Sequence, residues 1–200
     1  PNVLVVSPSN PAATVADLIA QARAKPGELT YGSSGVGSSL HMSGVILEQR
    51  TGVRLQHVPY RGAPAAVLAV INGEVTMGFF NAPPAMPLIK AGKLKAIAVT
   101  SPKRSAIMPD LPTIDEAGVK GYDVVGWWGF AAPAGLPQPI VDRLYRNIVT
   151  IMQDKELRAR MTENGFDILE QLPPAEFGRF IVAENAKWVP IVKASGAKAD

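Results

Sequence analysis

What this chain lacks excludes several classes of protein. It has no cysteine among its 200 residues, which excludes disulfides, thiol nucleophiles and cysteine-based metal sites. Only 18% of its residues are charged while 47% are hydrophobic, a composition that favours a sizeable folded core over disorder. The longest hydrophobic runs are too short to span a bilayer. The net charge of +3 is weak and dispersed, which argues against nucleic acid as a partner.

Motifs of catalysis are also missing. The spacing Gly32-Ser33-Ser34-Gly35 does not match the nucleophile-elbow pattern, and the phosphate-loop and dinucleotide fingerprints are absent. The sequence has no His-x-x-x-His or paired-acid motif for a metal. His41 and His57 are its two histidines, so a Ser–His pair stays an alternative, although no acidic partner is marked. We therefore expect no enzyme activity, no cofactor and no metal.

The first hundred residues alternate between short apolar runs and helical patterns. Thr14 with Asp17 predicts a capping-box-like helix start, and Gly52 predicts a helix end. The expected strands are residues 3–6, 29–32, 54–58, 75–80 and 94–100, and the helices between them end near residues 24, 50, 72 and 91. This succession predicts an α/β fold with a mostly parallel sheet.

The pattern changes near residue 132. Residues 124–132 include three large aromatic side chains and predict another strand, after which helices are expected over 140–152, 155–164 and 174–194. Pro190 is expected to kink or end the last helix. Four apolar residues lie near one face of that helix and favour core packing over a partner groove: Phe177, Ile181, Trp188 and Val192.

A Gly- and Ser-rich turn over residues 31–41 is the strongest candidate for a ligand site. It follows a short strand and leads into a helix that contains Leu40. Glycines let the backbone approach a ligand, serines cap helices, and the free N–H groups of a first helical turn attract a carboxylate or phosphate. The alternative is a flexible turn. His41 either donates to a ligand oxygen or serves as a buried, hydrogen-bonded structural ring.

Several short segments together resemble one protein family. They occur in the family's order and cover nearly the whole chain: YGSSGVGS at 31–38 with His41, VPYRG at 58–62, INGEV at 71–75, IKAGKLKAIAVT at 89–100, PDLPTIDEAG at 109–118, Gly121-Tyr122 and WWGFAAPAG at 127–135. On these segments the chain resembles the extracytoplasmic solute-binding proteins of tripartite tricarboxylate transporters, the TctC or Bug-type family.

The resemblance implies a two-lobed periplasmic-binding-protein fold that holds a small carboxylate between its lobes and passes it to integral-membrane transporter subunits. Residues 8–125 would form the α/β ligand-binding lobe, the second lobe of the family. Residues 1–7 and 126–133 would cross between lobes, and residues 134–200 would be the helical C-terminal part of the first lobe. The chain begins without Met or a signal-peptide core, so we expect a fragment or processed product that lacks the N-terminal half of the first lobe.

The resemblance also implies a set of ligand-binding residues around the Gly- and Ser-rich turn and at two strand ends. They are Ser33, Ser34, Gly35, Val36, Gly37, Ser38, Ser39, His41, Tyr60, Arg61, Phe80 and Asn81. Tyr60 would form an aromatic wall, while Arg61 would supply a charge or remain a solvated cation. Many family members have an acidic residue where this chain has Phe80, which argues against recognition of a ligand amino group there.

The sequence leaves open the class of carboxylate, the partner that receives it, and a hydrolase activity. Dicarboxylates, tricarboxylates, aromatic acids and acidic amino acids all suit such a site. Delivery to a transporter and delivery to a signalling partner are both compatible with the sequence, and a Ser/His hydrolase is the remaining alternative.

Without a first half-lobe the helical tail would need another surface for its apolar residues, so we expect a homo-oligomer or a dimer that exchanges the tail.

Overall fold

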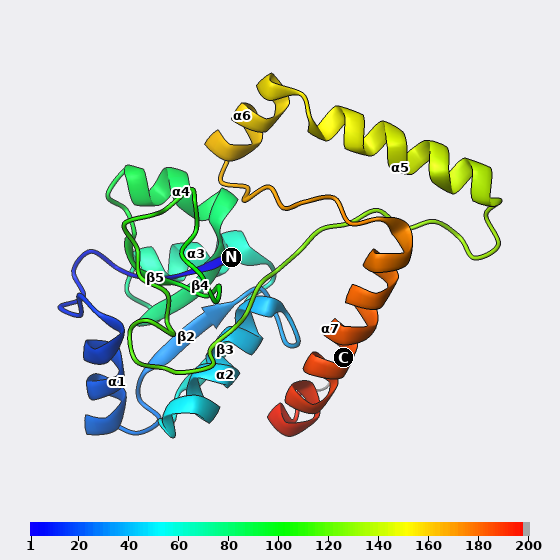
Figure 1. The fold of residues 1–200 in the computed structure, drawn as a ribbon. Helices are drawn as coiled ribbons and strands as arrows, with labels where there is room; N and C mark the ends of the chain where they lie inside the picture. Colours follow the sequence, from blue (N-terminus) through cyan, green and yellow to red (C-terminus); the bar gives the residue numbers. More distant parts are fainter. Residues whose placement is uncertain (198–200) are drawn as a thin grey trace.

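The computed structural model describes residues 1–197 and consists of a sheet-containing part followed by a helical tail (Figure 1). The elements run in the order β1 (Asn2–Val6), α1 (Val15–Ala24), β2 (Thr30–Ser33), α2 (Ser39–Thr51), β3 (Gln56–Pro59), α3 (Ala63–Ile71), β4 (Met77–Asn81), α4 (Ala82–Lys90), β5 (Lys95–Val99), α5 (Gln138–Met152), α6 (Lys155–Glu163) and α7 (Pro174–Ser195). The predicted α/β class is confirmed. No helix among residues 1–197 is both long and apolar enough to cross a membrane.

The five strands form one sheet in the order β3-β2-β4-β1-β5. Strand β2 pairs in parallel with β3 and β4, whereas β1 pairs antiparallel with both β4 and β5. Four of the five strands therefore run in one direction, as the sequence predicts, and β1 runs against them. The helices that connect the parallel strands cover both faces of the sheet, as expected for βαβ crossovers.

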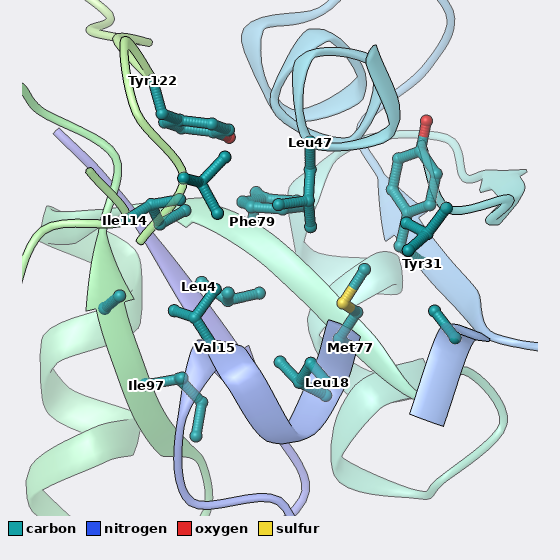
Figure 2. Close-up of a cluster of buried hydrophobic side chains, with 14 of the residues drawn as sticks. Leu4, Val15, Leu18, Tyr31, Leu47, Met77, Phe79, Ile97, Ile114 and Tyr122 are labelled. Atoms are coloured by element: carbon teal, nitrogen blue, oxygen red, sulfur yellow. The ribbon is translucent and has the colours of Figure 1, made fainter. Parts of the chain in front are cut away.

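Both faces of the sheet are buried, so its central strands are apolar at successive positions. On β1, Leu4 and Val6 contribute to one hydrophobic cluster and Val3 and Val5 to the other. The first cluster lies beneath α1, α2 and residues 114–124, and Figure 2 shows its Leu4, Leu47, Phe79 and Tyr122 side chains converging. The second cluster lies beneath α3 and α4.

Local signals fix the helix ends in this part. The amide of Asp17 donates to Thr14 Oγ1 at 3.1 Å and the amide of Thr14 donates to Asp17 Oδ2 at 2.9 Å, which is the predicted capping box. Gly52 ends α2 with a φ of +69°, a left-handed conformation that glycine adopts without steric cost.

The strand predicted over residues 124–132 is wrong. Only its beginning is tied to the sheet, where the Val124 amide donates to the Thr100 carbonyl at 2.9 Å, and the segment joins no sheet within residues 1–197. Its aromatic residues have high strand propensity, but a strand also needs a neighbouring strand, and the part of the chain that the structure describes supplies none beside this segment. Trp128 and Phe130 are 67% and 80% exposed as a result.

The helical tail follows the predicted element order but not the predicted packing. Helix α7 continues past Pro190 to Ser195, because a proline removes only one bond from an otherwise complete helical ladder. None of the residues in α5, α6 or α7 is buried. Of the four residues expected to face a core, Trp188 packs against the first cluster, and the other three do not contact it. The core-packing prediction is therefore wrong for most of this face.

Candidate ligand-binding site

The loop between β2 and α2 has a fixed conformation that its glycines and serines explain. Gly35 and Gly37 have φ values of +129° and +80°, which side chains rarely tolerate. Ser38 is the N-cap of α2: its hydroxyl donates to the Gly35 carbonyl at 2.8 Å and accepts from the His41 amide at 3.2 Å. The loop is thus an ordered turn and not a flexible linker in this structure.

Backbone donors of this loop are left open for a ligand. Among residues 1–197, the amides of Val36, Ser39 and Leu40 have no hydrogen-bond acceptor. The amides of Ser39 and Leu40 belong to the first turn of α2, where the helix dipole adds positive potential. Such a group of N–H donors suits a carboxylate.

Two stacked histidine rings lie next to the loop, and one of them is hydrogen-bonded to it. The rings of His41 and His57 stack with centroids 3.9 Å apart, and Tyr31 lies against His57 at 5.0 Å. The Gly37 amide donates to His41 Nδ1 at 3.1 Å. Burial lowers the pKa of His41, and burial together with the neighbouring His41 lowers the pKa of His57 to about 4. Both rings are therefore neutral near pH 7, and His41 Nδ1 is occupied by the Gly37 amide.

Ser33 and His57 are close enough for a catalytic pair but are arranged as a structural one. Ser33 Oγ lies 2.7 Å from His57 Nε2, yet Ser33 is fully buried and its hydroxyl also contacts the Gly35 carbonyl at 3.1 Å. No carboxylate hydrogen-bonds to His57 among the described residues. Residues 1–197 also contain no group of three or more His, Asp or Glu side chains placed to hold a metal.

A cavity of about 400 Å³ opens beside this loop, between the sheet and helix α7. Three of the predicted ligand-binding residues line it: Gly37, Ser39 and Asn81. Seven further lining residues were not predicted as ligand contacts: Met42, Val125, Gly126, Trp127, Trp128, Trp188 and Val192. One wall is thus polar and rich in backbone amides, and the opposite wall is aromatic.

Glu184 holds two tryptophan side chains of the aromatic wall in place. Its Oε2 accepts the indole N–H of Trp127 at 3.2 Å and that of Trp188 at 3.0 Å. The Trp127 ring also makes edge contacts with Phe177 and Phe180, at centroid distances of 5.5 and 5.2 Å. The aromatic motif at residues 127–130 could have indicated this wall, whereas nothing in the sequence pairs it with Trp188.

The other predicted ligand-binding residues do not line the cavity. The Tyr60 amide donates to the Ser33 carbonyl at 3.0 Å, which places residues 59–62 beside the loop, and Arg61 is exposed there. Phe80 is fully buried in the second cluster, because β4 directs it into the sheet face covered by α3. Val36 is 43% exposed, and Ser34, Gly35 and Ser38 shape the turn.

Comparison with known proteins places this chain among solute receptors. Residues 1–197 match the model of the tripartite tricarboxylate transporter family receptor. Protein BugT of Bordetella pertussis is 31% identical over 99% of this chain. Among solved structures, R. palustris Rpa4515 with adipate superposes with a TM-score of 0.89 at 36% identity over 98% of this chain. MatC from Rhodopseudomonas palustris with bound malate gives 0.83 at 27% identity over 96% of this chain.

The match covers most of this chain but a smaller share of its relatives. The chain spans 60% of the length of BugT and 66% of the length of both R. palustris chains. Family model, sequence relatives and fold agree with one another and with the segments that carry the resemblance. This chain belongs to the tripartite tricarboxylate transporter receptor family.

Proposed function

We propose that this chain is the ligand-binding part of a periplasmic receptor that captures a small carboxylate-containing metabolite for a tripartite tricarboxylate-type transporter. The proposal is supported by family membership and by relatives solved with adipate and with malate. A relative of the same fold is a periplasmic binding protein, BugD, with a TM-score of 0.85 at 28% identity. The periplasmic location and the membrane partner are parts of this proposal.

The observation that carries the proposal is the open amide group of the Gly- and Ser-rich loop beside an aromatic-walled cavity. The amides of Val36, Ser39 and Leu40 hold a carboxylate through fixed dipoles. No buried cation is needed, so the folded chain does not bear the cost of an unpaired charge. The Trp127 and Trp188 rings cover the carbon chain of the ligand and exclude water from it.

The division into lobes is part of the same proposal. Residues 8–125 form the α/β lobe, residues 1–7 and 126–133 cross between lobes, and residues 134–200 belong to the other lobe, with 198–200 lying outside the described residues. The cavity supports this division because its walls come from both sides. Ser39 and Asn81 lie on the sheet side, and Trp188 and Val192 lie on α7.

Calorimetric titration tests the proposed function. We expect saturable binding of at least one class among mono-, di- and tricarboxylates, nicotinate, aspartate and glutamate. Gly37→Val is expected to abolish this binding, because a side chain at a φ of +80° distorts the loop. Gly178→Ala, at a helical position with nothing within 4 Å, is the matched control and should bind as the wild type does. The absence of detectable binding for every ligand in the panel would contradict the proposal.

Two alternatives to a transport receptor, a signalling role and a hydrolase, are tested by partner capture and by an enzyme assay. Capture of membrane transporter subunits supports delivery for transport, whereas capture of a sensor's periplasmic domain supports a signalling role. The proposal includes no enzyme activity, in keeping with a fully buried Ser33. Turnover of ester substrates that is lost on Ser33→Ala would overturn that part.

The helical tail leads to a proposal about self-association. Several apolar residues of α5 and its surroundings are exposed, among them Ile140, Leu144 and Ile151 at 46%, 48% and 56%. A second copy of the chain, including one that exchanges its tail, covers these surfaces. Light scattering of the 200-residue chain should show a dimer or larger species, and a monodisperse monomer would contradict the proposal.

A further inference from the structure

Asn81 has an unusual position at a helix start. It ends β4 and is the N-cap of α4, where an asparagine normally accepts a hydrogen bond from the amides of the second or third helical residue. Those residues are Pro83 and Pro84, which have no N–H to donate. The Asn81 side chain makes no capping bond, so its amide is free for another role.

A buried polar network fixes which way this amide faces. The Ser43 hydroxyl donates to the Ser39 carbonyl at 2.8 Å, so toward Asn2 the Ser43 oxygen acts as an acceptor. It accepts from Asn2 Nδ2 at 3.1 Å. The opposite atom of the Asn2 amide is therefore its oxygen, and this Oδ1 accepts from Asn81 Nδ2 at 2.7 Å.

Asn2 is well placed to hold this orientation. It is fully buried on β1. Its backbone N–H donates to Thr100 Oγ1 at 2.8 Å, and its backbone carbonyl accepts from the Thr100 backbone N–H at 3.0 Å. Rotating its side-chain amide would direct its oxygen at two oxygen acceptors. The network therefore leaves Asn81 with one N–H committed to Asn2.

The rest of the Asn81 amide is open to the cavity. Among residues 1–197, its Oδ1 and its second N–H have no hydrogen-bond partner, and Asn81 lines the cavity with Ser39 and Gly126. A Cβ at Gly126 would lie 3.6 Å from Asn81 Nδ2 and 3.9 Å from Ser39 Oγ. The absence of a side chain at Gly126 thus leaves room for a ligand group beside both polar atoms.

We infer that Asn81 forms hydrogen bonds with a hydroxyl group on the bound carboxylate, and that the receptor prefers hydroxycarboxylates to the corresponding acids without a hydroxyl. A hydroxyl accepts from the open N–H of Asn81 and donates to its Oδ1, whereas a methylene pairs with neither polar atom. The inference rests on the proposed function and adds the chemical class of the ligand.

Matched ligand pairs test this inference by calorimetry. The pairs are malate with succinate, 2-hydroxyglutarate with glutarate, and lactate with propionate. We expect the wild type to bind the hydroxy member of at least one pair on the order of tenfold to a hundredfold more tightly. In Asn81→Leu this ratio should fall to about one while the affinity for the acid without a hydroxyl is retained. Asn185→Leu, at an exposed position of α7, is the matched control and should keep the ratio.

The possible outcomes separate this inference from the proposed function. Equal affinity within every pair in the wild type overturns the inference alone, and so does a hydroxyl preference that survives in Asn81→Leu. The wild-type ratios decide the question even where Asn81→Leu does not fold. Failure of every ligand of the panel to bind overturns the proposed function and this inference with it.

Discussion

The sheet-containing part, residues 1–124, and the helical tail, residues 134–197, use similar amphipathic patterns with different results. The first part contains all five strands and both hydrophobic clusters. The tail contains the two longest helices, of 15 and 22 residues, and buries no side chain of any of its helices. Helical periodicity thus predicts a helix and its apolar face, but burial depends on whether another surface covers that face.

This difference matters for the site, because the two parts supply different walls of one cavity. The loop and Asn81 are held by the buried sheet, whereas Trp188 and Val192 lie on α7. Few polar contacts tie the tail to the sheet part, among them the ion pair between Lys187 and Asp123 at 2.7 Å. The amide wall is therefore held by the buried sheet, whereas the aromatic wall is held mainly by contacts within and beside α7.

The largest expected effect comes from matched phenylalanines in the two parts. Phe79→Ala empties a fully buried position in the first cluster and should lower the free energy of unfolding by about 3–5 kcal/mol. Phe130→Ala, at an 80% exposed position, should change it by no more than about 0.5 kcal/mol. Urea unfolding followed by circular dichroism measures both, and equal effects would erase the contrast between the two parts.

A second comparison uses glycines. Gly37→Ala places a side chain at a φ of +80° in the loop and should cost about 1–2 kcal/mol of stability, together with about tenfold or more in carboxylate affinity. Thermal unfolding and calorimetric titration give the two numbers. Unchanged affinity in a folded Gly37→Ala protein would show that the loop amides do not hold the ligand.

A third prediction concerns pH. The folded-state pKa values of His41 and His57 lie below the ordinary value of 6.5, so on acidification the unfolded chain takes up protons first. Stability is then full above about pH 6.5 and falls by about 1–2 kcal/mol as the pH drops toward 4, less than the full shift of His57 implies because that ring is partly exposed.

His57→Gln tests the source of this pH dependence. The variant should flatten the decline in the free energy of unfolding between pH 6.5 and 4, since one titrating ring is gone. Asp17, Asp115 and Glu116 also have lowered pKa values, so they too lower stability on acidification, but mainly below about pH 4.5 and equally in the wild type and in His57→Gln. An identical decline in the variant would exclude His57 as its cause.

The smallest expected effect is a gain. Gly178 lies inside α7, and a Cβ at this position would have no atom within 4 Å, so Gly178→Ala should stabilise that helix by about 0.5–1 kcal/mol. Because the tail has no buried side chains in its helices, hydrogen exchange should slow in α7 while β1 and β4 keep their rates. Slowing across the whole chain would instead mean that both parts unfold as one unit.

The sequence was most informative where a feature depends on near neighbours in the chain. The capping box at Thr14 and the glycine at Gly52 mark helix ends locally, and the strand–turn–helix pattern locates the loop. The fully buried strands were recognisable because both sheet faces are covered by helices that the alternation itself predicts.

Features that depend on distant segments could not be predicted in this way. Trp127 and Glu184 are 57 positions apart, and no periodicity indicates that they meet. Phe79 and Phe80 are both fully buried, so a strand buried on both faces gives no sign of which residue is nearer the ligand. The prediction of a strand over residues 124–132 was wrong because high strand propensity does not provide a neighbouring strand to pair with.

Tryptophan fluorescence during a carboxylate titration tests the central claim most directly. All three tryptophans of the chain, Trp127, Trp128 and Trp188, line the cavity, so a ligand held there must change their emission. We predict a saturable change for at least one carboxylate, with a midpoint that agrees with calorimetry and is lost in Gly37→Val. Calorimetric binding with unchanged tryptophan emission would contradict the account, because the carboxylate would then bind elsewhere.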